Sequence, residues 1–181
     1  MGSAILGHMK KIILFILKPL SFLPALLMMA LIYSFSAQTG EVSGNLSYEI
    51  SYKIVEVKND LLHTGKGEYE LSLEADSIHH YVRKAAHMTE YFLLEIAVAF
   101  PLFVYRIRGI WLVIVAGIVC VGFAGFDEYH QSFVANRGPS IKDVGIDSIG
   151  AFLGIMLVQF FCWSTLHNPD SPRKRKNKRR R

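Results

Sequence analysis

The stretch IWLVIVAGIVCVGFAGFDEYHQSF, residues 110–133, decides the fold of this chain. Its first part, residues 110–126, carries no charge and is close to the length that a helix needs to cross the hydrocarbon core of a bilayer. Two adjacent carboxylates, a histidine and a glutamine follow it at once. A second apolar run starts at residue 147, so the acidic side chains lie where the chain turns back into lipid. Such groups are costly there unless they face the inside of a helical bundle and find partners.

Three further apolar runs, residues 12–35, 87–105 and 147–166, predict three more spans. Hydrophobic residues make up 51% of the 181 residues and are bunched into these runs, which is typical of a membrane protein. We therefore predict an all-α integral membrane protein built as a four-helix bundle. A cleaved signal peptide is the alternative for the first run. The segment YSFSAQ, residues 33–38, is a poor cleavage site of the small-x-small type, so an uncleaved span is preferred.

Basic residues set the expected orientation. Lys10 and Lys11 precede the first span, Arg106 and Arg108 fill the short connection after the second, and residues 173–181, RKRKNKRRR, follow the fourth. Four spans place all three groups on one side, so the positive-inside rule puts both termini in the cytoplasm. The C-terminal run holds eight basic residues, and without it the net charge would change from +5 to −3. A basic run next to a span favours binding to anionic lipid headgroups over a nucleic-acid partner, and no nucleic acid is expected.

One membrane domain, residues 9–168, is expected, followed by a basic cytoplasmic tail over residues 169–181. The opening MGSAILGH, residues 1–8, is interpreted as the remnant of an expression vector. Cys120 and Cys162 lie inside apolar runs and have neither metal-ligand nor disulfide-framework spacing. They are interpreted as buried small hydrophobic residues.

The region between the first two spans predicts an extracytoplasmic amphipathic helix. Apolar residues recur there at helical spacing: Leu46, Ile50, Ile54, Val57 and Leu61. We expect this helix to lie on the outer membrane surface or over the spans. Residues 71–82 predict a second, short helix that leads into the span at residues 87–105.

The most polar residues of the spans fall at one depth, at the outer interface. They are Arg83, Lys84, His87 and Glu90 in the second span, Asp127, Glu128 and Gln131 after the third, and Arg137, Ser140, Asp143 and Asp147 before and at the start of the fourth. Arg83, His87 and Glu90 share one helical face. Adjacent helical residues point about 100° apart, so Asp127 and Glu128 cannot both aim at the same partner.

Three segments resemble the VanZ-like family of membrane proteins: FSAQTGEVS, residues 35–43; RKAAHMTEYFLL, residues 83–94; and FDEYHQSFVANRGPSIKDVGIDSIGAFLG, residues 126–154. The resemblance covers most of residues 9–166. It implies a multi-pass protein of the bacterial inner membrane with a role in the cell envelope and a contribution to resistance against the glycopeptide teicoplanin. It implies no particular reaction. The motif residues that it carries onto this chain are Arg83, Lys84, His87, Glu90, Tyr91, Asp127, Glu128, Gln131, Arg137, Ser140, Asp143 and Asp147.

The polar residues have two interpretations, one structural and one enzymatic. In the first, Arg83 and Arg137 neutralise the carboxylates and pin the helix ends together, since structural ion-pair networks resemble active sites. In the second, the cluster is an enzyme site for a lipid-linked or phosphate-bearing envelope substrate. His87, Glu90, Asp127 and Glu128 are then catalytic, with His87 as acid or base. The substrate-binding residues are Arg83, Lys84, Gln131, Arg137, Ser140, Asp143 and Asp147.

Three other classes remain open at this point. A metal site would use His87 and Glu90 together with Asp127, Glu128 and His130, but the H-E-x-x-H motif is absent, and we assign no metal and no cofactor. A non-catalytic protein would bind membrane lipid, a lipid-linked cell-wall precursor or the glycopeptide itself. A transporter is disfavoured because the four spans show no inverted repeat and the charges gather at one face.

Overall fold

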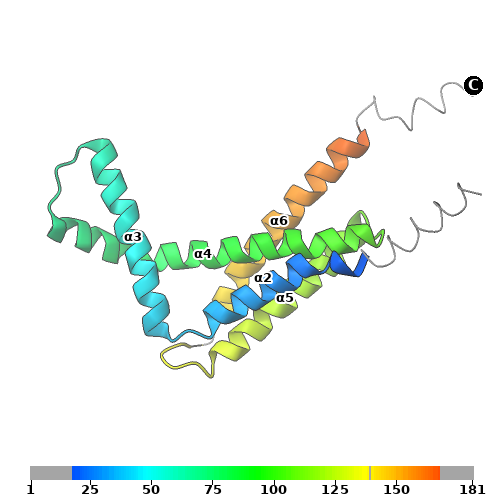
Figure 1. Ribbon diagram of the computed structural model, residues 1–181, viewed down its shortest axis with the longest axis horizontal. Coiled ribbons are helices and arrows are strands. Elements are labelled where there is room, and N and C mark those ends of the chain that lie inside the picture. The colour runs from blue at the N-terminus through cyan, green and yellow to red at the C-terminus, as the bar shows by residue number, and fades with distance from the viewer. Residues whose placement is uncertain (1–17, 139, 168–181) are drawn as a thin grey trace, which may run out of the picture.

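The computed structural model describes residues 18–138 and 140–167. Every regular element in these ranges is a helix, which confirms the all-α prediction (Figure 1). The helices are α2 (Leu23–Ser36), α3 (Gly40–Leu62), α4 (Glu68–Val104), α5 (Ile110–Gln131) and α6 (Ile141–His167).

Four helical segments are long and apolar enough to cross a membrane, which confirms the predicted number of spans: Lys18–Ser36, Glu68–Val104, Ile110–Gln131 and Ile141–Cys162. The predicted start of the first span at residue 12 lies outside the described residues. The same holds for residues 1–8, which are interpreted as a vector remnant, for Lys10 and Lys11, and for the expected basic tail. The apolar stretch of α5 ends at Phe126, but its helix continues to Gln131 and so carries the acidic pair in helical geometry.

The core of the bundle forms where α4 meets α2, α5 and α6. Gly150 and Gly154 of α6 bring two helix backbones together, since a Cβ at Gly150 would lie 2.1 Å from the carbonyl oxygen of Met88. A Cβ at Gly154 would lie 2.6 Å from the carbonyl oxygen of Phe92. Small residues that allow such close approach are the usual contact between membrane helices.

The short helix expected over residues 71–82 and the following span are one continuous helix, α4, of 37 residues. No glycine or proline interrupts it between its start and Pro101, which lies in the last turn. At 1.5 Å per residue α4 is about 55 Å long, whereas the hydrocarbon core of a bilayer is about 30 Å thick. The N-terminal part of α4 therefore projects beyond the bundle (Figure 1).

Helix α3 crosses this projecting part of α4 (Figure 1). Val55 packs with Leu71 and Ala75 in a small core of its own, separate from the core of the bundle. Outside this core, Glu74 of α4 forms ion pairs with Lys58 and Lys66. The stripe predicted from the apolar spacing is not the packed face: Leu46, Ile50, Ile54, Val57 and Leu61 are all exposed.

Replacement of Val55 by alanine should loosen α3 from α4. Val55 is 2% exposed, and its loss removes two buried methyl groups and leaves a cavity, at a cost of about 2 kcal/mol. Hydrogen exchange of the α3 amides in detergent should then become faster by more than tenfold. Ile54→Ala is the matched control, because Ile54 is 48% exposed and its truncation should leave exchange unchanged. Equal effects of the two variants would contradict the observed packing face.

The two ends of the bundle differ in their polar content. The connection between α4 and α5, with Arg106 and Arg108, lies at one end of the bundle. The return segment between α5 and α6, described at residues 132–138 and 140, lies at the opposite end (Figure 1). Helix α2 starts near the first of these ends and finishes near the second (Figure 1). The predicted polar residues gather at the end of the bundle that contains the return segment.

Candidate functional site

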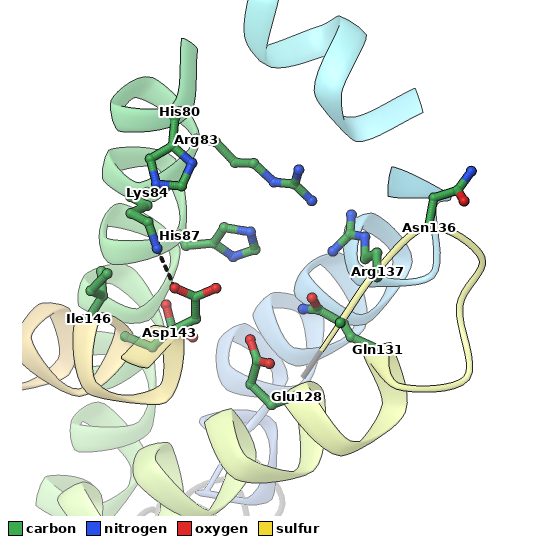
Figure 2. A pocket seen from close by; sticks show the side chains of 12 residues that line it. His80, Arg83, Lys84, His87, Glu128, Gln131, Asn136, Arg137, Asp143 and Ile146 are labelled. Carbon is green, nitrogen blue, oxygen red and sulfur yellow. Dashed lines mark hydrogen bonds and ion pairs between the residues drawn. The ribbon is translucent and has the colours of Figure 1, made fainter. Parts of the chain in front are cut away.

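A pocket of about 180 Å³ opens at this polar end, between α4, α5, α6 and the return segment (Figure 2). Its lining residues are His80, Arg83, Lys84, His87, Glu128, Gln131, Asn136, Arg137, Gly138, Asp143, Ile146 and Asp147. A water molecule occupies about 30 Å³ in the liquid, so the pocket has room for a small anionic group and several waters. Of the predicted site residues, Glu90, Asp127 and Ser140 do not line it.

Helix α4 supplies the basic wall of the pocket. Arg83, Lys84 and His87 project from one face because residues three and four apart on a helix are neighbours. Lys84 forms an ion pair with Asp143 and so joins α4 to α6. The Nδ1 atom of His87 lies 3.6 Å from an oxygen of Glu90, one turn deeper.

Helix α5 turns its polar end inward. Asp127 and Glu128 are both buried, 1% and 7% exposed, and they have different partners. Asp127 accepts a hydrogen bond of 2.9 Å from the side-chain amide of Gln131, one turn later. Glu128 lines the pocket and accepts a hydrogen bond of 2.7 Å from the backbone N–H of Ser140. The two neighbours thus point to different partners, as their helical positions predict.

Arg137 reaches the pocket from the return segment. Its Nη2 atom donates a hydrogen bond of 3.2 Å to the carbonyl oxygen of Phe35 at the end of α2. Its Nε and Nη1 atoms are buried and have no hydrogen-bond partner among the described residues. Burial, and then the positive charge of Arg83, lowers the pKa of Arg137 from its usual value. The guanidinium groups of Arg83 and Arg137 face one another across the pocket (Figure 2).

Helix α6 supplies the remaining acidic groups of the pocket. Asp143 carries the ion pair to Lys84, and Asp147 lies one turn further along the same face. Asp147 is 2% exposed, and its Oδ1 atom has no hydrogen-bond partner in the described part of the chain. The pocket therefore joins a cationic side on α4 and the return segment to an acidic side on α5 and α6.

The two arginines of the pocket, Arg83 and Arg137, form no ion pair with the described carboxylates. Within residues 18–138 and 140–167, neither Arg83 nor Arg137 lies within ion-pair distance of a carboxylate. Glu90, Asp127 and Asp147 each keep a buried oxygen without a hydrogen-bond partner in the same ranges. Buried polar groups are normally paired, and orphaned groups at one site indicate a place for water or a ligand. The arginines and carboxylates described here therefore do not form the predicted network of ion pairs that would hold the helix ends together.

The return segment is held against the start of α3 by a close backbone contact. The N–H of Gly40 donates a hydrogen bond of 3.0 Å to the carbonyl oxygen of Ala135. A Cβ at Gly40 would lie 1.9 Å from the carbonyl oxygen of Asn136, so no larger residue fits there. Arg137 follows directly, which makes the position of its side chain depend on Gly40.

Replacement of Gly40 by alanine should therefore disturb the pocket. The added methyl group must push the return segment away from α3, at a cost of about 1–3 kcal/mol. Cysteine crosslinking between the start of α3 and the return segment should become slower in this variant. Gly44→Ala, on the same helix, is the matched control, since a Cβ at Gly44 meets nothing within 4 Å. A Gly40→Ala protein with the crosslinking rate of wild type would contradict this contact.

The proposed metal ligands are not arranged as a metal site. No group of three or more histidine, cysteine, aspartate and glutamate side chains in the described residues is placed to hold a metal ion. His130, one of the candidates, packs against Tyr33 of α2 with ring centroids 4.5 Å apart and the ring planes tilted by 41°. This contact fixes the end of α5 against the end of α2.

Sequence reasoning missed three polar residues. His80 and Asn136 line the pocket, and His80 has the signal that found its neighbours, because it lies three, four and seven residues before Arg83, Lys84 and His87. Asn136 offers no such periodicity. Glu95 is fully buried in the spanning part of α4. A carboxylate inside an apolar run is itself a signal, since such residues are rare and face the bundle interior.

Fold and pocket define a multi-pass membrane protein with a polar site at one end of its bundle. Residues 21–162 match the family model described as VanZ/LLP1. The chain therefore belongs to the VanZ-like family, as its motifs predict. No match was found among curated proteins, and none among solved structures.

Proposed function

We propose that this protein binds an anionic group of an envelope molecule in the polar pocket, and that this binding contributes to teicoplanin tolerance in a bacterium. The group is a phosphate or carboxylate of a membrane lipid or of a lipid-linked cell-wall precursor. One observation carries the proposal: Arg137 is anchored through Nη2, while its buried Nε and Nη1 atoms have no partner among the described residues. A guanidinium group keeps its positive charge and carries several N–H donors, so the donors of Arg137 that lack a partner suit a phosphate or carboxylate ligand.

The electrostatics of the pocket support an anion as its ligand. Two guanidinium groups that face each other without carboxylate partners repel one another, and a bound anion relieves that repulsion. Lys84 already neutralises Asp143, so it is less available to a ligand. The pair Arg83 and Arg137 is thus the expected anion-binding element, with Gln131 and Asn136 as neutral polar neighbours.

The proposed location is the outer face of the bacterial cytoplasmic membrane. Arg106 and Arg108 lie at the end of the bundle opposite the pocket. By the positive-inside rule, the end with these arginines faces the cytoplasm and the pocket faces outward. Both termini are then cytoplasmic, and the basic tail binds anionic headgroups. The exposed apolar stripe of α3, Leu46 to Leu61, faces the outer lipid surface in this arrangement.

A second candidate function is catalysis on the bound group. His87 lines the pocket beside Arg83, and its Nδ1 atom lies 3.6 Å from an oxygen of Glu90. A histidine oriented by a carboxylate next to an anion site is the arrangement that general acid–base chemistry needs. Glu128 and Asp127 would support it, and the attacking group would be water. His87→Gln separates the two functions, because it should abolish turnover and leave anion binding within a few-fold of wild type.

Teicoplanin tolerance of cells that express matched variants tests the proposed function. The variants are His87→Gln, Glu90→Gln, Asp127→Asn and Arg137→Lys, each compared at equal amounts of membrane-inserted protein. Lys142→Gln is the control, since Lys142 is exposed and outside the pocket. Normal insertion with lost tolerance supports a functional pocket. If tolerance falls only because the variant protein accumulates poorly in the membrane, the residues have a structural role. If the wild-type protein itself gives no tolerance, the antibiotic part of the proposal is refuted.

A further inference from the structure

Glu95 is a carboxylic acid enclosed in the membrane-spanning core. It is 0% exposed, and neither of its carboxyl oxygens has a hydrogen-bond partner of good geometry among the described residues. It lies two helical turns beyond His87, or about 12 Å further into the bundle at 1.5 Å per residue. The proposed anion site does not use it.

Within the described part of the chain, no basic side chain acts on Glu95. On α5 the thiol of Cys120 is the polar group that acts on it. On α6 it meets Gly154, where a Cβ would lie 3.0 Å from the Cβ of Glu95. Helix α2 contributes Ala25 and Ile32 to the same core. An ionised carboxylate without a partner is very costly in such a place, whereas a neutral carboxylic acid is tolerated.

A line of polar side chains connects Glu95 with the pocket. Arg83, His87, Tyr91 and Glu95 follow one another at intervals of four residues and so share one face of α4. Tyr91 is fully buried, and its hydroxyl group has no hydrogen-bond partner within the described ranges.

Tyr91 lies on this face of α4 between His87 and Glu95. Asp127, Asp147, Glu90 and Cys120 act on it electrostatically. A hydroxyl group both donates and accepts hydrogen bonds, so it can pass a proton between an acid on one side and an acid on the other. No other buried O–H group of the described residues stands on this face between His87 and Glu95.

We propose that Glu95 is a membrane-embedded proton-binding site that exchanges its proton with the outer pocket past the Tyr91 hydroxyl. In the step, the carboxylic O–H bond of Glu95 breaks and the proton leaves toward Tyr91. Tyr91 passes its own proton to Asp127, Asp147 or a water in the pocket. A new O–H bond forms on Tyr91 as its original one breaks, the acceptor gains the released proton, and no group is oxidised or reduced. Charged and titratable groups that bear on this route are Arg83, His87, Glu90, Asp127 and Asp147 at its outer end and Cys120 at its inner end.

Infrared spectroscopy of the purified protein at neutral pH tests the site. A protonated carboxylic acid has a carbonyl stretch that a carboxylate lacks and that shifts in D₂O. The difference spectrum between wild type and Glu95→Gln should show this band. Glutamine has the size of the protonated acid, so the bundle should stay folded, and Glu95→Asp should restore a band at a shifted position. A spectrum in which Glu95→Gln removes a carboxylate band instead would overturn the proposal.

The rate of the D₂O shift tests the route. Tyr91→Phe removes only the hydroxyl oxygen and should slow the shift about tenfold, which corresponds to about 1.4 kcal/mol of added barrier. Tyr81→Phe, on the exposed part of α4, is the matched control and should exchange at the rate of wild type. Equal rates in Tyr91→Phe and wild type would refute the route through Tyr91. No ligand enters these measurements, so their outcome is independent of the proposed anion binding.

Discussion

Replacement of Arg137 by glutamine should weaken binding of the anionic ligand at least about thirtyfold. The side chain is half-buried, and its free Nε and Nη1 atoms are the donors assigned to the ligand. Loss of one partner of a buried, charged hydrogen-bonded pair costs about 2–5 kcal/mol, and 1.4 kcal/mol corresponds to a factor of ten in affinity. Teicoplanin tolerance should fall to the level of cells without the protein.

Arg137→Lys sharpens this prediction. Lysine keeps the positive charge but lacks the planar fork that anchors on the Phe35 carbonyl and offers two further donors at once. We expect it to recover only a small part of the lost affinity. Lys142→Gln removes the same charge as Arg137→Gln from an exposed position and should change neither affinity nor tolerance. Similar losses in the two glutamine variants would mean that net charge, and not the geometry of the pocket, attracts the ligand.

Replacement of Gly150 by alanine should strongly destabilise the bundle. The new Cβ would lie 2.1 Å from the carbonyl oxygen of Met88 and 2.9 Å from its carbonyl carbon, and these are backbone atoms that cannot rotate away. Helix α6 must shift away from α4, at a cost of about 2–3 kcal/mol. The shift also moves Asp143 and Asp147 away from Lys84 and His87.

Thermal unfolding in detergent, followed by circular dichroism, measures this effect. Gly122→Ala serves as control, because Gly122 is exposed on α5 and a Cβ there meets nothing within 4 Å. Alanine is the better helix former, so this control should be neutral or slightly stabilising. An unfolding temperature of Gly150→Ala equal to that of wild type would contradict the close contact of α4 and α6.

Much of this architecture could be predicted from residue patterns. The four spans follow from uninterrupted apolar runs, and the inward turn of Asp127 and Glu128 follows from the cost of charge near lipid. The length of α4 was harder to predict, because its N-terminal half is polar and its C-terminal half apolar, so hydropathy divides one helix into two. Intrinsic helix propensity, without a break before Pro101, is what keeps it continuous.

Tertiary contacts decided what the patterns could not. The apolar spacing on α3 marks a stripe that stays exposed, while Ser47, Ser51 and Val55 pack against α4. Small residues packed this way carry little hydropathy signal, so the packed face could not be found from the sequence alone. The same holds for Arg137, whose anchor on the Phe35 carbonyl joins residues 102 positions apart.

Equilibrium binding of a short-chain lipid phosphate to the purified protein in detergent tests the central claim most directly. Isothermal titration would compare wild type, Arg137→Gln and Lys142→Gln, with inorganic phosphate as a second ligand to separate a lipid headgroup from a free anion. We predict saturable binding of one equivalent to wild type and Lys142→Gln, and its loss in Arg137→Gln. Wild-type affinity in Arg137→Gln, or no saturable binding of either ligand to wild type, would contradict the assignment of the pocket as an anion site.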